Sequence, residues 1–241
     1  MAPAPEILLP SKSHINRCGQ HLVDAVSDDY DIEQHVEEFD EAFAVVSDFR
    51  AAHAYPMQKI RYGLRSMVRS EDAAELVAQR LKRLPRIVRK LRRMEKSNLA
   101  RLEDIGGVRA ILRDGPELER VRARIRKRWA ASISRERDYI QDPKDMGYRA
   151  VHFVVRRDGR SIEVQLRTQG QQQWAEAVEA ADARLKLNLK DGEGPQEMVE
   201  YFAAAGEVIY LNEYGQRIPT EVAERFQAAN QAVIDAGYYR A

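Results

Sequence analysis

Residues 150–168 read Ala-Val-His-Phe-Val-Val-Arg-Arg-Asp-Gly-Arg-Ser-Ile-Glu-Val-Gln-Leu-Arg-Thr. The pair Asp158-Gly159 is typical of a tight hairpin turn, and both flanking segments are rich in β-branched residues. We therefore expect one strand at Ala150–Arg156 and a second at Arg160–Thr168.

The second of these strands alternates apolar and polar side chains. Because successive side chains of a strand point to opposite faces, each set shares one face. The apolar set is Ile162, Val164 and Leu166, and the polar set is Glu163, Gln165 and Arg167. One face is therefore expected to pack a core, and the other to present an acid, an amide and a guanidinium side by side.

Working outward, strands alternate with helices, which predicts an α/β (α+β) fold with a mixed sheet covered by helices. Further strands are expected at Val108–Leu112 and Ile133–Tyr139. Helices are expected at Lys12–Val26, Ile32–Ala52, from Pro56 to about Val68, Glu71–Ala78, from Pro85 onward, Glu117–Trp129, Gly170–Leu189, Gln196–Asn212 and Thr220–Ala236. This order predicts a helical N-terminal extension (1–78), a catalytic core (79–190) and C-terminal helices that pack on it (191–241).

The composition favours a folded protein in a reducing compartment. The chain has 241 residues, of which 44% are hydrophobic and 32% charged, and a single cysteine, Cys18. An intrachain disulfide is therefore excluded, and so is a zinc site built on several cysteines. We see no signal peptide and no apolar run of the ~20 residues that cross a bilayer, so we expect a cytoplasmic protein without a membrane segment.

A net charge of +1 conceals strong segregation of charge along the chain. Residues 24–48 hold ten acids and no Lys or Arg, whereas 80–101 hold ten basic residues and one acid, and 120–128 hold six basic residues and no acid. Basic clusters in a nearly neutral protein indicate a surface for phosphate-rich partners, although solvated helix faces would give the same pattern.

Several residue types suit phosphate chemistry on a nucleotide, which needs cations, metal-binding carboxylates and groups that fix the acceptor. Arg80 and Lys82 alternate on an extended segment, and Arg86 and Lys90 share a face of the next helix. Asp104 precedes two glycines that allow close approach of a ligand. Each residue also has a structural interpretation: Asp104 as a turn cap, Glu163 as a partner of Arg167, and Tyr148, His152 and Trp174 as packing residues.

The order of these pieces resembles the RelA/SpoT nucleotide pyrophosphokinase family. The matching pieces are Arg80-Leu-Lys-Arg with Arg86 and Lys90, Asp104-Ile-Gly-Gly-Val-Arg109, Asp138-Tyr-Ile-Gln-Asp-Pro-Lys-Asp-Met-Gly-Tyr-Arg-Ala-Val-His152, Ile162-Glu-Val-Gln-Leu-Arg-Thr168 and Trp174-Ala-Glu176. They span about Arg80 to Glu176 in the expected order. The resemblance implies the synthetase fold of that family, which is related to the nucleotidyltransferases.

The resemblance also implies roles for individual residues. ATP would be bound by Arg80, Lys82, Arg86, Lys90 and Arg109, and Mg²⁺ by Asp104 and Glu163. Glu163 is also the candidate general base. The acceptor would be bound by Lys144, Tyr148, His152, Gln165 and Arg167, with Tyr148 stacking on its base. A ribose hydroxyl would attack the β-phosphorus of ATP, and AMP would leave.

Two positions depart from the family pattern: Arg86 stands where a serine is common, and Met146 where an asparagine is common. The second departure bears on the acceptor. No histidine is followed by aspartate, so the hydrolase module of long family members is missing. The chain resembles a small, synthetase-only member.

The segments Ser11–Gly19 and Gln79–Arg83 are similar to those of toxic small alarmone synthetases from toxin–antitoxin and phage-defence systems. This implies transfer to the 3′ CCA end of tRNA, inhibition of translation and a cognate antitoxin. We expect Arg124, Lys127 and Arg128 to contact such a tRNA. The alternatives are alarmone synthesis from guanine or adenine nucleotides, and a catalytically decayed module that binds RNA or an antitoxin.

Overall fold

The computed structural model describes residues 7–27, 29–73, 76–94, 98–189 and 193–238. At its centre is a five-stranded sheet with the strand order β1-β2-β5-β4-β3. The strands are β1 (Leu76–Leu81), β2 (Gly106–Leu112), β3 (Ile133–Asp138), β4 (Val151–Arg157) and β5 (Arg160–Thr168). The pair β2–β5 is parallel and the other pairs are antiparallel, so the sheet is mixed, as predicted.

The predicted hairpin joins β4 to β5. Asp158 and Gly159 both have positive φ, 48° and 71°, as a tight hairpin turn requires. The register pairs Val154 with Glu163 and His152 with Gln165. Ile162, Val164 and Leu166 are fully buried, so the alternation read from the sequence is confirmed.

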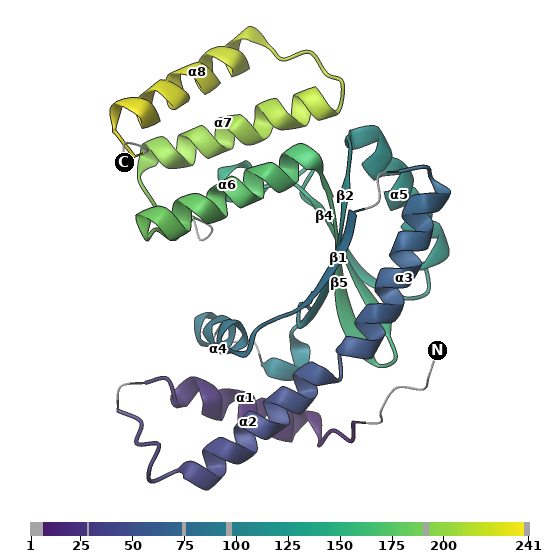
Figure 1. The fold of residues 1–241 in the computed structure, drawn as a ribbon, viewed down its shortest axis with the longest axis vertical. Coiled ribbons are helices and arrows are strands. Elements are labelled where there is room, and N and C mark those ends of the chain that lie inside the picture. Colours follow the sequence, from purple (N-terminus) through teal and green to yellow (C-terminus); the bar gives the residue numbers. More distant parts are fainter. Residues whose placement is uncertain (1–6, 28, 74–75, 95–97, 190–192, 239–241) are drawn as a thin grey trace.

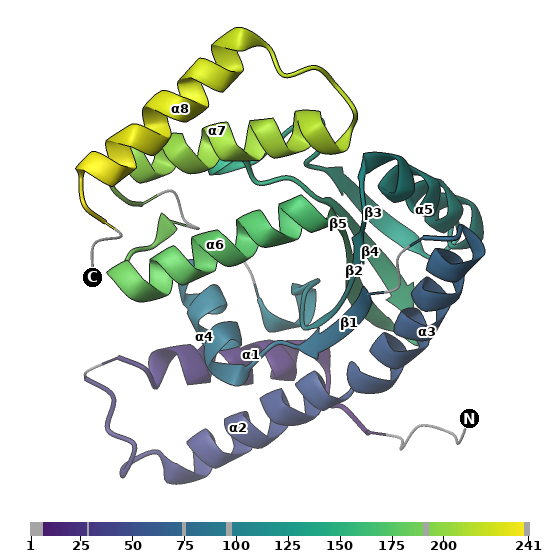
Figure 2. The ribbon, with the colours of Figure 1, turned by 45° about the horizontal axis from the view of Figure 1, so that its top comes forward.

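Helices surround the sheet in an order close to the predicted one. They are α1 (Lys12–Asp24), α2 (Val36–Ala51), α3 (Ala54–Ser70), α4 (Leu84–Arg93), α5 (Gly115–Arg128), α6 (Gln169–Leu185), α7 (Gln196–Glu213) and α8 (Thr220–Asp235), with short 3₁₀ turns η1 (Leu99–Arg101) and η2 (Asp145–Gly147). Figures 1 and 2 show α3 and α5 on one side of the sheet and α4 and α6 towards the other.

The main core lies between the sheet and the pair α3 and α5. Leu64 of α3 and Leu118 and Ile125 of α5 are fully buried against the apolar face of β5. Asp114 caps α5 by accepting a hydrogen bond from the backbone N–H of Glu117 at 2.9 Å. The helices α3 and α5 therefore cover the apolar face of the sheet, and the polar face of the same strands stays available for a functional site.

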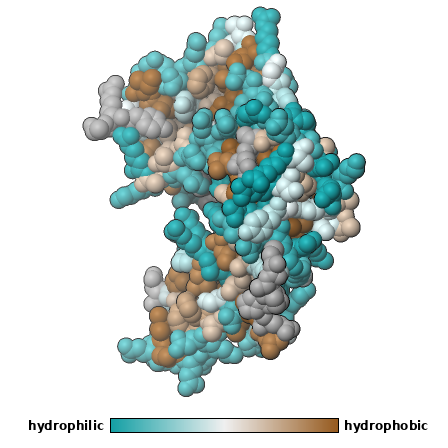
Figure 3. Space-filling model, turned by 45° about the vertical axis from the view of Figure 1, so that its right-hand side comes forward, coloured by the Kyte–Doolittle hydropathy of each residue, from teal (hydrophilic) through white to brown (hydrophobic). Residues whose placement is uncertain are grey.

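Two smaller cores flank the polar face. One joins α1, α2 and α4, and the other joins α6, α7 and α8. The space-filling view shows the surface hollowed between these two parts of the molecule (Figure 3). None of the helices in the described ranges is long and apolar enough to span a bilayer.

The structure corrects the element boundaries at four places. The helix expected at Glu71–Ala78 is wrong: α3 ends at Ser70, Asp72 turns with φ 49°, and Leu76 begins a strand. Leu76 pairs with Ile111 of β2, so pairing with the sheet outweighs local helix propensity.

The other corrections are smaller. Pro56 does not separate two helices, because α3 begins at Ala54 and holds Pro56 in its first turn, where no N–H partner is required. Helix α2 begins at Val36 instead of Ile32. Helix α6 ends at Leu185, since Lys186 takes a left-handed conformation.

Candidate active site

The polar face of β2, β5 and β4 forms the floor of the site. Gly107 lies in register with both Arg80 and Glu163, so these three positions share one face. A Cβ atom added to Gly107 would meet nothing nearer than the carbonyl oxygen of Arg80 at 3.9 Å. Gly107 therefore leaves space on the floor between Arg80 and Glu163, as close approach of a ligand would require.

Asp104 stands at the edge of this floor, two residues before β2. Its Oδ2 accepts hydrogen bonds from the ammonium groups of Lys82, at 2.5 Å, and Lys90, at 2.7 Å. Burial would raise the pKa of Asp104, but the two lysines outweigh it and hold the pKa below its usual value. Its other oxygen, Oδ1, is buried and has no hydrogen-bond partner among the described residues.

Glu163 lies mid-strand on the polar face, with its side chain 17% exposed. Its Oε1 is 3.1 Å from Nδ1 of His152, and its Oε2 accepts a hydrogen bond from Gln165 at 2.7 Å. Burial alone would raise the pKa of Glu163. The contacts with His152 and Gln165 lower it by more than burial raises it, so the pKa lies below its usual value. The nearby charge of Asp104 also raises this pKa, so the two carboxylates interact.

The predicted acceptor residues form one connected cluster. Nε2 of His152 lies 2.7 Å from the Tyr148 hydroxyl, and Arg167 donates to the same hydroxyl at 2.9 Å. The ammonium of Lys144 lies 4.4 Å from the ring centroid of Tyr139, which itself contacts His152 edge to face at 5.1 Å. Lys144, Tyr148, His152, Gln165 and Arg167 are thus brought together.

Tyr148 is held more tightly than its position after a glycine suggests. Its ring is half-buried, with Trp174 at 6.1 Å and the Arg167 guanidinium at 5.1 Å from its centroid. Burial raises the pKa of its hydroxyl. The ring is therefore packed against its neighbours, and its stacking on an acceptor base stays a prediction. Trp174 is buried, as expected, and donates to the carbonyl oxygen of Phe202 at 2.8 Å.

One side-chain oxygen joins a predicted ATP-binding residue to a predicted acceptor-binding residue. Oε1 of Gln172, in the first turn of α6, accepts hydrogen bonds from Arg109 at 2.7 Å and Arg167 at 3.0 Å. Burial lowers the pKa of Arg109, and the positive charge of Arg167 lowers it further. Gln172 thus holds two like charges together on the floor of the site.

The remaining residues predicted to bind ATP, Arg80 and Arg86, differ in their surroundings. Arg80 lies on the polar face by its register with Gly107. Arg86 is exposed on α4, one turn before Lys90. No contact of Arg86 with the cluster around Asp104 is found among the described residues.

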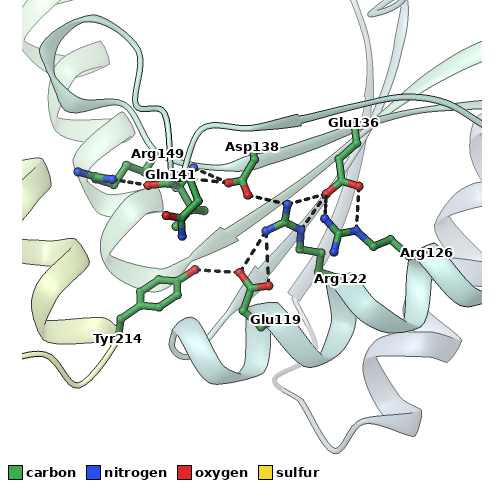
Figure 4. A network of polar contacts seen from close by, with 9 residues as sticks. Glu119, Arg122, Arg126, Glu136, Asp138, Gln141, Arg149 and Tyr214 are labelled. Carbon is green, nitrogen blue, oxygen red and sulfur yellow. Dashed lines mark hydrogen bonds and ion pairs between the residues drawn. The ribbon is translucent and has the colours of Figure 1, made fainter.

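The three residues expected to bind tRNA lie away from this face. Helix α5 packs on the apolar side of the sheet, and Arg124 is 3.6 Å from Glu71. Its neighbours Arg122 and Arg126 both bind Glu136, and Arg122 also binds Asp138 (Figure 4). Much of the basic run therefore balances acids of the fold, while Lys127 and Arg128 are exposed.

The residues present fit a magnesium ion. In the described ranges, no three His, Cys, Asp or Glu side chains gather as a complete metal site. Mg²⁺ in nucleotide enzymes, however, is held by one or two carboxylates, with phosphate oxygens and water completing the shell. Asp104 and Glu163 are both kept ionised, and the buried, unpartnered Oδ1 of Asp104 is an oxygen of the required kind.

Two residues of the site were not predicted from the sequence. Gln172 lies in a run of glutamines that gives no sign of which one faces the floor. Tyr139 is the last residue of the strand expected at Ile133–Tyr139, but only the fold brings its ring against His152 and Lys144.

Comparison with known families decides which architecture this is. The family model described as "Region found in RelA / SpoT proteins" matches residues 79–189. Residues 79–189 are therefore similar to the RelA/SpoT region. This segment contains every residue of the floor and of the Asp104 and Tyr148 clusters.

Individual relatives agree with the domain match. A probable GTP diphosphokinase of Arabidopsis thaliana chloroplasts, RSH3, is 33% identical over 93 residues, which cover 38% of this chain and 13% of the relative. The GTP pyrophosphokinase YjbM of Bacillus subtilis is 25% identical over 142 residues, covering 54% of this chain and 67% of the relative. The chain therefore spans only a small part of the first relative.

Solved structures share the fold. Small alarmone synthetase 2 of Bacillus subtilis superposes with a TM-score of 0.57 at 21% identity, covering 78% of this chain and 98% of that one. Small alarmone synthetase 1 of the same organism, bound to its product pppGpp, gives a TM-score of 0.51 at 19% identity, covering 76% and 95%. The predicted synthetase fold, with a mixed sheet flanked by helices, is confirmed.

Proposed function

We propose that this chain is a pyrophosphokinase that transfers the β,γ-pyrophosphoryl group of ATP to a ribose 3′-hydroxyl. The observation that carries the proposal is the gathering of Asp104, Glu163 and the cations Lys82, Lys90 and Arg109 around one open strip of sheet. The relatives named as GTP diphosphokinase and GTP pyrophosphokinase support the same chemistry.

The site residues divide the work of the reaction. Lys82, Lys90 and Arg109 would bind the phosphates of ATP, and Asp104 and Glu163 would hold Mg²⁺, which supplies charge neutralisation on those phosphates. Glu163 accepts the proton of the ribose hydroxyl. The hydroxyl oxygen bonds to the β-phosphorus. The bond between this phosphorus and the oxygen that links it to the α-phosphorus breaks, and AMP leaves with that oxygen. His152 and Gln165 keep Glu163 ionised and oriented for this step.

A guanine nucleotide is the acceptor that we favour. Lys144 and Arg167 lie beside Tyr148 in a compact cluster, which suits the phosphates and base of one nucleotide. The structure of a synthetase bound to pppGpp supports this choice by its shared fold. The test incubates the protein with Mg²⁺, ATP labelled in its β- and γ-phosphates, and GDP, GTP, adenine nucleotides or deacylated tRNA. Label on GDP or GTP supports the proposal, and label on tRNA alone contradicts the choice of acceptor.

A tRNA acceptor is the second candidate, and one observation favours it. Arg89 and Arg92 are exposed on α4, the helix that supplies Lys90 to Asp104. Contacts with RNA phosphates release counterions, so binding would weaken steeply with salt. Together with this acceptor we propose translation arrest as a toxin, a cognate antitoxin and a role in phage defence.

A matched pair of variants separates these cationic surfaces. If tRNA is the acceptor, reversal of charge at Arg89 and Arg92 should abolish its labelling. The same reversal at Lys127 and Arg128 of α5 should leave the labelling unchanged, because α5 packs on the other side of the sheet. The opposite result would restore the role first assigned to Arg124, Lys127 and Arg128.

A further inference from the structure

A surface cavity of about 720 Å³ opens at the end of the sheet where β1 ends and β5 begins. Its lining includes Arg50 at the end of α2, Tyr55 and Gln58 at the start of α3, Gln79 of β1, and Asp158 and Arg160 at the β4–β5 turn. Small-molecule sites typically have volumes of about 300–1,000 Å³. The cavity is therefore large enough for a nucleotide-sized ligand.

This cavity lies at the end of the sheet beside the edge strand β1, and Arg80, whose position faces the catalytic floor, also belongs to its lining. Arg160 has the same strand parity as Ile162, which is packed against α3 in the main core. Glu163 belongs to the other parity and faces the floor. A ligand held by Arg160 would therefore bind on the face opposite Glu163, next to the edge strand that carries Arg80, and the donor site is filled with an ATP analogue in the test below.

The cavity carries positive charge that the fold does not balance. The Arg160 guanidinium lies 5.6 Å from the ring centroid of Phe49 and forms no ion pair with a described residue. Arg50 donates its Nε–H to the carbonyl oxygen of Lys82 at 2.7 Å and likewise has no carboxylate partner in the described ranges. Asp158, the acid in the lining, is already paired with Lys59 at 2.9 Å.

These two guanidiniums are suited to a phosphate. Guanidinium matches the geometry of phosphate oxygens in a bidentate contact, and a partly buried cation without a counter-ion gains most from an anionic ligand. Burial lowers the pKa of Arg160, in keeping with a charge that lacks an anion. Gln58 and Gln79 add amide donors beside the two arginines.

A short chain of contacts leads from the cavity to the catalytic floor. Arg50 holds the backbone oxygen of Lys82, and the ammonium of Lys82 holds Oδ2 of Asp104 at 2.5 Å. A ligand that binds the Arg50 guanidinium and moves it would therefore weaken its hydrogen bond to the Lys82 backbone and shift Lys82. The consequence is a change at Asp104, a residue proposed to bind Mg²⁺.

We propose that this cavity binds a phosphorylated small molecule through Arg50 and Arg160, and that the bound molecule modulates the catalytic site through Lys82. The binding half of this proposal stands by itself, whereas the modulation half rests on the proposed function. The two halves are therefore tested by separate measurements.

Binding is tested by isothermal titration calorimetry with inorganic pyrophosphate as the probe. The protein is first saturated with Mg²⁺ and a non-hydrolysable ATP analogue, so that the donor site is filled. Arg160→Gln should weaken pyrophosphate binding at least tenfold. Arg157→Gln is the matched control, because Arg157 is exposed on the same hairpin and does not line the cavity. It should bind as the unaltered protein does.

Arg160→Lys guards against misfolding, because it keeps the charge and should lose only part of the affinity. Absence of pyrophosphate binding, or equal affinity in the Arg160→Gln and Arg157→Gln proteins, would overturn the site. For modulation, the transfer rate at saturating ATP and acceptor should change with pyrophosphate in the unaltered protein and not in Arg160→Gln. The same response in both proteins would overturn modulation. A protein without transfer activity would refute the proposed function and modulation with it, and leave the binding result standing.

Discussion

Replacement of Gln172 by leucine tests whether donor and acceptor residues are coupled through one side-chain oxygen. The substitution removes the acceptor of two hydrogen bonds, from Arg109 at 2.7 Å and from Arg167 at 3.0 Å, and leaves two neighbouring guanidiniums without it. Hydrogen bonds to charged groups each contribute about 1.5–3 kcal/mol. The site is partly open to solvent, so we take the lower end for each bond.

About 1.5 kcal/mol at each arginine corresponds to roughly a tenfold change in an equilibrium constant. We therefore expect Gln172→Leu to raise KM about tenfold for ATP and about tenfold for the acceptor, with a smaller change in kcat. The assay measures initial rates of labelled pyrophosphate transfer while each substrate is varied in turn. Gln173→Leu is the matched control, because Gln173 is the exposed next residue of the same helix.

Identical kinetic constants for Gln172→Leu and Gln173→Leu would show that the Gln172 side chain does not support either arginine. A change in KM for only one substrate would show that Gln172 orients one arginine and does not couple the two. Melting curves of both variants should coincide, since Gln172 is only half-buried.

Substitutions at three further positions test individual roles. Glu163→Gln should lower transfer by at least the ~10²–10⁴-fold typical of a general base while the protein stays folded, and near-normal rates would remove Glu163 from the reaction. His152→Leu removes a contact that lowers the pKa of Glu163 and leaves the burial that raises it. The acid limb of the pH–rate profile should therefore move to higher pH, and an unmoved limb would show that His152 has no influence on the base. If the Tyr148 ring stacks on a base, Tyr148→Ala should weaken acceptor binding by about 1–3 kcal/mol, measured as the KM for the acceptor. Tyr148→Phe should keep the stacking and serves as the control. An equal loss of affinity for ATP and for the acceptor would favour a packing role for the ring.

The sheet and the polar face of β5 could be predicted because the signals are local. Asp158-Gly159 defines the turn, and the alternation after it assigns Glu163, Gln165 and Arg167 to one face. Strand β1 could not be predicted in the same way, since its partner β2 lies some thirty residues further along the chain. A pairing at that distance leaves little trace in the residues of the strand itself.

The basic run in α5 shows the limit of reading charge from sequence. Arg122 and Arg126 look like a surface for nucleic acid, yet both bind Glu136 of β3 (Figure 4). The acids that balance them lie in another element, and only the packing of α5 on the sheet brings the two together. Gln172 illustrates the converse, because an unremarkable residue gains its importance from two arginines on separate strands.

The central claim is transfer of pyrophosphate to a ribose hydroxyl at the floor between Asp104 and Glu163. The most direct test incubates the purified protein with Mg²⁺, ATP labelled in its β- and γ-phosphates, and GDP, and analyses the products by chromatography and phosphorus NMR. We predict a guanosine product labelled at its 3′ position and AMP in equal amount, with neither formed by Glu163→Gln. Release of AMP without a 3′-labelled nucleotide or RNA, or equal product from a folded Glu163→Gln protein, would contradict the account.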